Sequence, residues 1–431
     1  GEEALTAVSL IFPLQNLSLA ISCGIGIAMN AFIARHLGAK DDNKASYYAT
    51  QGIVMSLAHS LLFLIIGLFF IRPFLNMFTT NQNVINYGMQ YGMIVVSLVI
   101  GQFIHLAIEK MFQATGNMMM PMIMQIFGAV INIILDPILI FGYFGLPAFG
   151  VAGAAIATVI GQFSAASLAF VLFKKYNTHL HISFKKFRVD FHVISQLYSI
   201  AIPSSVMMCL PSVLVSLLNG ILSSISQSAV AFFGVYYKLQ TFIYMPTSGI
   251  VQGMRPLMSY NYGAKNYTRV RNTFKLVMKV CLGFAFIASG TVMLFSEFFV
   301  SIFSNDAQTI VFSSWALRVF LIGSGMFGAQ IACQQSFMAL GQAKVSVWMA
   351  ITRKIILLIP LIYIFPYLLG GSSLATSIAG PIASMVHDGS RVFAVLFAEP
   401  VSDILAAIIT TFMFIRFYKK ELKQPDQIIE D

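Results

Sequence analysis

The chain has 431 residues, of which 58% are apolar and only 10% are charged, with a mean hydropathy of +0.82 and a net charge of +10. Soluble domains are about 45–50% apolar and about 25% charged, so this composition excludes an ordinary soluble protein and indicates a membrane protein. The basic excess lies in short connections between apolar runs, where the positive-inside rule explains it better than nucleic-acid binding does. Lipid is therefore the expected surrounding, and no nucleic-acid partner is expected.

Eleven apolar stretches are long enough to cross a bilayer, which takes about 20 residues of helix. In chain order they cover residues 7–35, 46–71, 84–108, 119–143, 151–173, 193–224, 229–259, 276–296, 308–338, 345–366 and 392–417. One alternate set of connections, with the C-terminal tail, carries eighteen Lys and Arg residues, and the other set carries only Arg72 and Arg391. The positive-inside rule predicts that the basic set and the C-terminus are cytoplasmic.

Two parts of the chain match at a constant offset of 225 residues. The matches join residues 14–15 with 239–240, 38–40 with 263–265, and Gly116 with Gly341. Matching glycine and polar positions over such a length indicates duplication. The second copy opens with the span 193–224, which has no counterpart ahead of Ala4, so the first helix of the first copy is expected to be absent from this chain.

The sequence therefore predicts an all-α polytopic membrane protein made of two six-helix bundles from a tandem parallel repeat. Residues 1–180 are expected to form an N-terminal lobe with five of its six helices, and residues 181–431 a C-terminal lobe with six. A parallel repeat of this kind places substrate near the middle of the membrane, in a cleft between the lobes.

Three stretches resemble the multidrug and toxin extrusion family of transporters, in its bacterial DinF-like and MepA-like branch. They read NIILDPILIFGYFGLPAFGVAGAAIATVIGQ (132–162), GVYYKLQTFIYMP (234–246) and PVSDILAA (400–407). The resemblance extends over nearly the whole chain and implies twelve helices around a central cleft. It departs from the family in the missing first span, which carries an acid of the N-lobe cation site, and in the long connection 369–393. That connection is expected to be an outer loop or a re-entrant segment.

The resemblance also implies the activity. We expect a secondary active exporter, an antiporter of multiple cationic or aromatic drugs and toxins, driven by an H⁺ or Na⁺ gradient through alternating access. The coupling ion is the only cofactor expected, since the four cysteines lie inside apolar runs without a CxxC pair. The expected state is a multi-pass monomer in the bacterial cytoplasmic membrane, without enzymatic activity.

Asp136 is the strongest candidate for the coupling residue. It lies deep in an apolar span, where a carboxylate costs at least about 2.5–3.5 kcal/mol unless it faces a polar interior or binds a cation. Asn132 lies one helical turn earlier on the same face, and Pro137 leaves a backbone carbonyl free nearby. The resemblance matches Asn132, Asp136 and Thr158 to the N-lobe cation site, while the alternative is that Asp136 only pins neighbouring helices.

The second half carries further polar residues inside spans. Arg353 either pairs with an acid such as Asp403 or reaches toward a helix end, and Asp403 serves either coupling or helix contact. Glu109 and Glu399 lie near span ends, where a carboxylate is expected to reach water. The aromatic residues at 236, 237, 242 and 244 either stack on flat drugs or pack against other helices. The residues expected to line the substrate cleft are Gln15, Tyr237, Lys238, Gln240, Tyr244, Arg353 and Asp403.

Three other functions compete with drug export. A lipid-linked precursor flippase of the same superfamily is favoured by the buried cations Lys238 and Arg353 and disfavoured by Asp136. An intramembrane enzyme finds no support, because the sequence has neither an HExxH motif nor a nucleophile elbow. A channel is less consistent with two duplicated lobes and a buried carboxylate, which favour alternating access.

Overall fold

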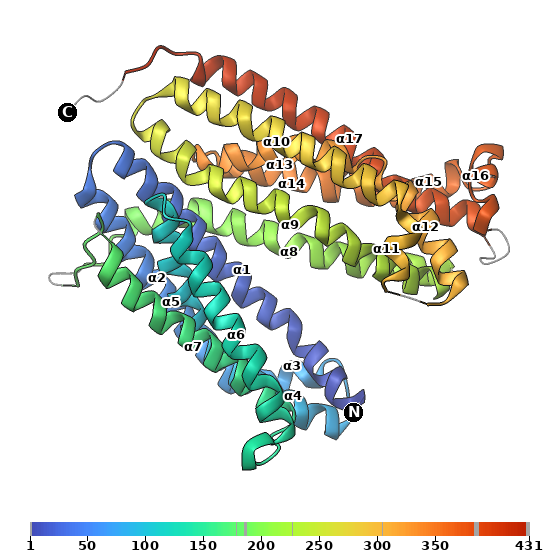
Figure 1. The fold of residues 1–431 in the computed structure, drawn as a ribbon, viewed down its shortest axis with the longest axis horizontal. Helices are drawn as coiled ribbons and strands as arrows, with labels where there is room; N and C mark the ends of the chain where they lie inside the picture. Colours follow the sequence, from blue (N-terminus) through green and yellow to red (C-terminus); the bar gives the residue numbers. More distant parts are fainter. Residues whose placement is uncertain are drawn as a thin grey trace. The chain divides into compact units, whose positions relative to one another are not determined.

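The computed structural model describes residues 2–177, 179–184, 188–225, 227–303, 305–382 and 388–427, without the side chains of 212–216, 219, 221–225, 227–238 and 242. This described part consists of helices and connections, with no strand (Figure 1). By contact density the chain divides into unit 1, Gly1–Cys209, and unit 2, Leu210–Asp431. Each unit is considered by itself below.

Unit 1 contains seven helices, a short 3₁₀ turn and the first part of α8. They are α1 (Glu2–Gly38), α2 (Asp42–Phe69), α3 (Ile71–Asn76), α4 (Gln82–Ser97), α5 (Ile100–Ala114), α6 (Met119–Phe141), η1 (Tyr143–Gly145), α7 (Val151–Tyr176) and α8 (Phe191–Ile225). Unit 2 continues with α9 (Gln227–Gly263), α10 (Tyr267–Leu294), α11 (Ser296–Ser301), α12 (Ala307–Leu321), α13 (Ser324–Ala339), α14 (Ala343–Ile351), the π-helix η2 (Thr352–Leu358), α15 (Ile359–Leu368), α16 (Ser373–Ile378), η3 (Gly380–Ile382), α17 (Gly389–Phe417) and the π-helix η4 (Tyr418–Leu422).

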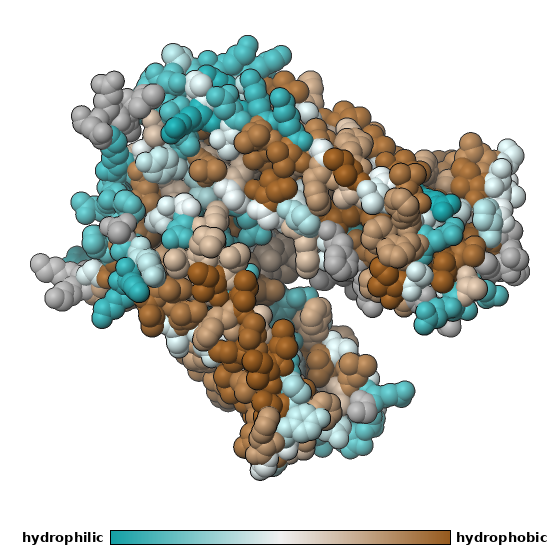
Figure 2. Space-filling model, in the orientation of Figure 1, coloured by the Kyte–Doolittle hydropathy of each residue, from teal (hydrophilic) through white to brown (hydrophobic). Residues whose placement is uncertain are grey.

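Among the described residues, nine helical segments are long and apolar enough to cross a membrane, and the pair α12–α13, bent by 47°, makes a tenth. These ten coincide with ten of the eleven expected spans. The remaining one, 229–259, falls on α9 (Gln227–Gly263), where the side chains of 227–238 and 242 are not described. On the face shown in Figure 2, hydrophobic residues cover broad areas of α6, where Ile126, Ile133 and Ile134 are exposed. Such apolar outer surfaces are what a lipid-facing helix requires.

The division between the units lies inside α8, later than the 180/181 lobe boundary expected from the sequence. The first half of α8 packs in unit 1 because Gly24 of α1 lets its backbone approach: a Cβ at Gly24 would lie 2.6 Å from the carbonyl oxygen of Ala201. Tyr198 of the same half is hydrogen-bonded to His59 of α2 at 3.2 Å. Gly24 therefore serves close contact between α1 and α8.

The 225-residue repeat is visible in the backbone turns. Lys40 and Lys265 both adopt a left-handed conformation, with φ of 57° and 54°, and Gly116 and Gly341 do the same with φ of 84° and 80°. A left-handed lysine is uncommon because its Cβ crowds the backbone. The matching left-handed backbone at equivalent positions of both copies supports the duplication. It is structural evidence, separate from the matching of residue types in the sequence.

The helix caps repeat as well. The side chain of Asp41 accepts a hydrogen bond from the backbone N–H of Lys44 at the start of α2, and Asn266 does the same for Arg269 at the start of α10. Both bonds are 3.0 Å long and satisfy an N–H that the helix itself leaves free. The bond from Lys44 also lowers the pKa of the Asp41 carboxyl, because it stabilises the charged form.

The basic connections fold back onto helix ends. In unit 1, Gln51 of α2 donates to the carbonyl of Arg188 at 2.7 Å, which ties the segment between α7 and α8 to the start of α2. In unit 2, the backbone N–H of Thr268 donates to Asp426 at 2.9 Å. The C-terminal segment and the basic α9–α10 turn therefore share one end of unit 2.

The long connection 369–393 is partly folded. It contains α16 and η3, and the indole N–H of Trp315 in α12 donates to the carbonyl of Ile378 at 2.8 Å. Ala375 and Ile382 are fully buried. The part of this connection up to Ile382 therefore packs onto α12, while its side of the membrane stays a prediction.

Candidate functional site

Asp136 lies in the second half of α6, and its side chain is half-buried. The amide Nδ2 of Asn132 donates to Asp136 Oδ1 at 3.4 Å, the contact that their four-residue spacing predicts. The backbone of α7 passes close to this pair, since a Cβ at Gly161 would lie 3.1 Å from Asn132 Cβ. Thr158 of α7 donates its hydroxyl to the carbonyl of Ala154 at 2.9 Å, so it can face a ligand only as an acceptor.

A row of amide side chains continues from α7 toward α1. Gln162, one turn after Thr158, donates to Gln102 of α5 at 3.3 Å, and Gln102 donates to the hydroxyl of Ser22 at 3.1 Å. Gln15, expected in the substrate cleft, donates a 3.3 Å hydrogen bond to the hydroxyl of Tyr91 in α4. The interior of unit 1 is thus polar along several helices, as a buried carboxylate requires.

Glu109 was expected to reach water, and this prediction is wrong. The side chain is 1% exposed, and its two oxygens accept hydrogen bonds from Lys110 at 2.8 Å, Gln113 at 2.9 Å and Gln125 at 2.8 Å. Gln125 comes from α6, which folds back along α5 after a short turn. Position along a helix therefore placed Glu109 near an end, but packing against the next helix encloses it.

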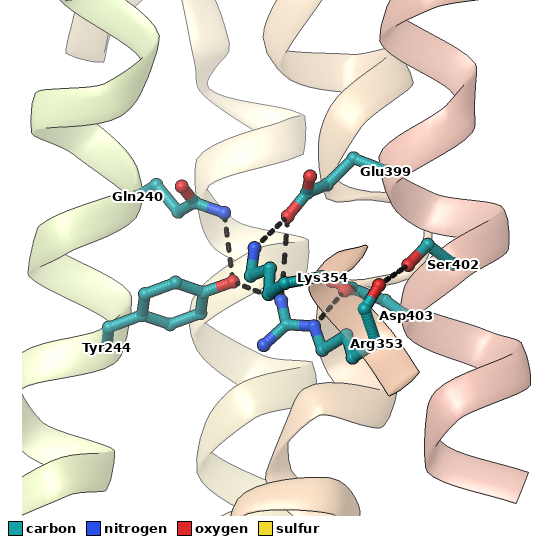
Figure 3. A network of polar contacts seen from close by, with 7 residues as sticks. All are labelled: Gln240, Tyr244, Arg353, Lys354, Glu399, Ser402 and Asp403. Carbon is teal, nitrogen blue, oxygen red and sulfur yellow. Dashed lines mark hydrogen bonds and ion pairs between the residues drawn. The ribbon is translucent and has the colours of Figure 1, made fainter. Parts of the chain in front are cut away.

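The densest charged cluster among the described residues lies in unit 2, and it joins α9, η2 and α17 (Figure 3). Arg353 Nε donates to Asp403 Oδ1 at 2.6 Å, and Lys354 Nζ donates to Glu399 Oε1 at 2.9 Å. A second guanidinium nitrogen of Arg353 lies 3.5 Å from the same Glu399 oxygen. Arg353, Glu399 and Asp403 are each less than 7% exposed and the Lys354 side chain is 15% exposed, so two cations and two anions balance in a largely buried quartet.

Neutral groups complete the cluster around Arg353. Its guanidinium donates to the hydroxyl of Tyr244 at 3.1 Å and lies 4.8 Å from the ring centre of Phe327. Gln240, one turn before Tyr244 in α9, donates to the same hydroxyl at 2.9 Å, and Ser402 donates to the backbone carbonyl of Arg353 at 2.8 Å. Nε and one Nη of the guanidinium thus meet an anion, a hydroxyl and a second carboxylate, which offsets the cost of burying the cation.

These contacts decide several expectations. Arg353 pairs with Asp403, so the alternative of reaching toward a helix end is wrong, and the prediction that Glu399 meets water is also wrong. Gln240 and Tyr244 come together with this pair, whereas the side chains of Tyr237 and Lys238 are not among those described.

Sequence reasoning missed Lys354 altogether. The available signal was a second cation directly beside Arg353 in an apolar span, matched by two acids, Glu399 and Asp403, one turn apart in the last span.

A family model described as MatE matches residues 1–138 and 203–364, which is more than half of the chain. The chain belongs to the MatE family. As a MatE protein it is a multi-pass membrane transporter. The family expected from the three sequence stretches is thereby confirmed.

Two curated relatives show the range of this MatE chain's neighbours. It is 28% identical over 371 residues to the multidrug export protein MepA of Staphylococcus haemolyticus, covering 86% of this chain and 80% of that protein. It is 25% identical over 394 residues to an FAD transporter of Shewanella oneidensis, covering 90% and 85%.

Solved structures share the fold. The structure of the MATE multidrug transporter DinF-BH, solved as a complex, is 28% identical, has a TM-score of 0.82, and is aligned over 96% of this chain and 88% of that one. An outward-facing conformation of a multidrug resistance MATE family transporter is 21% identical with a TM-score of 0.86, covering 99% and 90%. The second likeness concerns the fold alone.

Proposed function

We propose that this MatE chain is a secondary active exporter that moves cationic and aromatic small molecules out of the cell in exchange for H⁺ or Na⁺. The observation that carries the proposal is Asp136, a half-buried carboxylate within an apolar helix whose described polar partner is Asn132. A charge in that position costs at least about 2.5–3.5 kcal/mol. A group kept at that cost is suited to bind and release a cation, which is what coupling requires.

The cargo is inferred from the relatives. MepA is named a multidrug export protein, and DinF-BH is named a multidrug transporter. Both are 28% identical to this chain over most of its length. We infer that the substrates are several rather than one. Flat cationic aromatic compounds are among them, as the family resemblance of the sequence implies.

The direct test is transport in proteoliposomes under imposed gradients. We expect a flat cationic dye to move against its own gradient when either a pH gradient or a Na⁺ gradient is imposed in the exchanging direction. The gradient that drives movement identifies the coupling ion. Movement that needs neither gradient, or equilibration only, would contradict the antiport proposal.

The Shewanella relative favours a second cargo, since it is named an FAD transporter. Adding FAD to the same vesicles tests this anionic, flat molecule beside the dye. The flippase alternative is weaker than the sequence indicated, because Asp403 neutralises Arg353, one of the two cations that favoured it.

The proposed orientation places the C-terminus and the basic connections in the cytoplasm. In a variant lacking the four native cysteines, His179→Cys and Phe144→Cys report on opposite ends of α7, which has 26 residues and is about 39 Å long. Their native side chains are 56% and 90% exposed. We expect an impermeant thiol reagent added to intact cells to label the variant at 144 and not the variant at 179. The reverse pattern would invert the topology.

A further inference from the structure

The charged quartet of unit 2 contains a feature that ion pairing alone does not require. Arg353 and Asp403 already form a complete pair, with further bonds from Arg353 to Tyr244. Glu399 and Lys354 form a second pair beside it, and Lys354 Nζ binds only one of the two carboxylate oxygens. Among the described residues, no hydrogen-bond donor reaches the other oxygen, Oε2, although the Glu399 side chain is 4% exposed.

A buried carboxylate oxygen without a donor has unused capacity to bind a cation. An ionised carboxylate offers about four lone-pair sites on its two oxygens, and burying it unpaired is costly. Figure 3 shows that Lys354 reaches Glu399 with the tip of its side chain. A lysine ammonium is a compact point charge on a flexible stem, comparable in this respect to a free monovalent cation.

We propose that Lys354 is a tethered cation: its ammonium fills, from within the chain, a monovalent-cation site formed around Glu399 in unit 2. The site at Glu399 is occupied by this covalently attached ammonium and not by a free ion. The local backbone favours this assignment, because Lys354 lies in the π-helix η2, and π-helical turns are frequent at functional sites.

The first copy of the repeat has no equivalent. At the 225-residue offset, Arg353 and Lys354 correspond to Gly128 and Ala129 of α6. There a Cβ at Gly128 would lie 3.0 Å from the carbonyl oxygen of Gly161, so the two helices are in close contact and leave no room for long side chains. The Lys354 position therefore has no counterpart at the matching point of unit 1.

The net charge of the quartet indicates what removal of the Lys354 ammonium would do. The quartet holds Arg353 and Lys354 against Glu399 and Asp403, a net charge of zero. Without Lys354 it holds one uncompensated negative charge, and the vacated space lies next to the Oε1 atom of Glu399. Oxygen ligands of this kind suit a hard cation such as Na⁺. The inference rests on unit 2 and is independent of whether Asp136 couples transport.

The test is cation-dependent thermal stability of the purified full chain, measured in choline chloride, sodium chloride or methylammonium chloride at equal concentration. All variants carry Asp136→Asn, so that the proposed site of unit 1 cannot contribute. We expect Lys354→Ala to melt at a Tm higher by about 2–4 °C in Na⁺ or methylammonium than in choline, as for ligand binding at about ten times its Kd. The parent with Lys354 intact should melt at the same temperature in all three salts.

Two matched variants control the result. Lys354→Met removes the charge but fills the space, so it should show no dependence on the cation. The double variant Lys354→Ala/Glu399→Gln removes the carboxylate and should lose the dependence. Lys354→Ser, which also empties the space, undergoes the same measurement if the alanine variant does not fold, with the same expected rise. Equal melting of the Lys354→Ala or Lys354→Ser variant in all three salts would overturn the proposal, and so would a rise that persists in the double variant or is already present in the parent.

Discussion

Replacement of Asp136 by Asn is expected to abolish gradient-driven export while leaving the folded protein intact. Asn keeps the shape of the side chain and a hydrogen bond with Asn132, but it can bind neither a proton nor Na⁺ as a counter-charge. A coupling ion shifts a conformational equilibrium only through its different affinity for the two states. Without the charge that difference vanishes, and we expect uphill dye transport to fall to the level of empty vesicles.

The measurement is dye efflux from proteoliposomes under the gradient that drives the wild type, with Tm as the folding control. Asn132→Ala and Thr158→Ala provide a graded comparison, because each removes a polar group and no charge. They should retain part of the activity. An Asp136→Asn variant that still concentrates dye at the normal rate would rule out this residue, and Glu109 and Asp403 would become the next carboxylates to test.

Features repeated along the chain could be predicted from the sequence, because they depend on local chemistry. The offset that matched Lys40 with Lys265 also predicted that their turns correspond, and both lysines share the same left-handed backbone. The four-residue spacing of Asn132 and Asp136 likewise predicted their contact. Helical periodicity fixes such relations within one element without any knowledge of its neighbours.

Relations between helices could not be predicted in the same way. The sequence places Glu109 and Glu399 near span ends, but only packing decides that both are enclosed by partners from other turns or helices. Lys354 was missed because two neighbouring cations in a sequence do not indicate which carboxylate each of them binds. The division inside α8 depends on Gly24, whose close contact with Ala201 involves residues far apart in the chain.

Breaking the Arg353–Asp403 pair should destabilise unit 2 more than removing any exposed ion pair. Both side chains are buried, their shortest contact is 2.6 Å, and removing one partner leaves the other charge uncompensated. Such a loss costs about 3–5 kcal/mol. For a domain of this size we expect Asp403→Ala or Arg353→Met to lower the Tm by roughly 6–20 °C.

The double variant Arg353→Met/Asp403→Leu separates the pair's own stability from the cost of an orphaned charge. It leaves Lys354 and Glu399 balanced, so it should recover most of the Tm lost in either single variant, since well-packed apolar residues replace buried ion pairs at little cost. Lys44→Ala is the surface control: Lys44 lies 3.1 Å from Asp41, with side chains 66% and 32% exposed, and its loss should cost at most about 1 kcal/mol. If both single variants melt within the range of that control, the quartet does not stabilise unit 2. If the double variant melts no higher than the singles, the pair contributes more than charge compensation, and its bonds to Tyr244 and Glu399 would account for the rest.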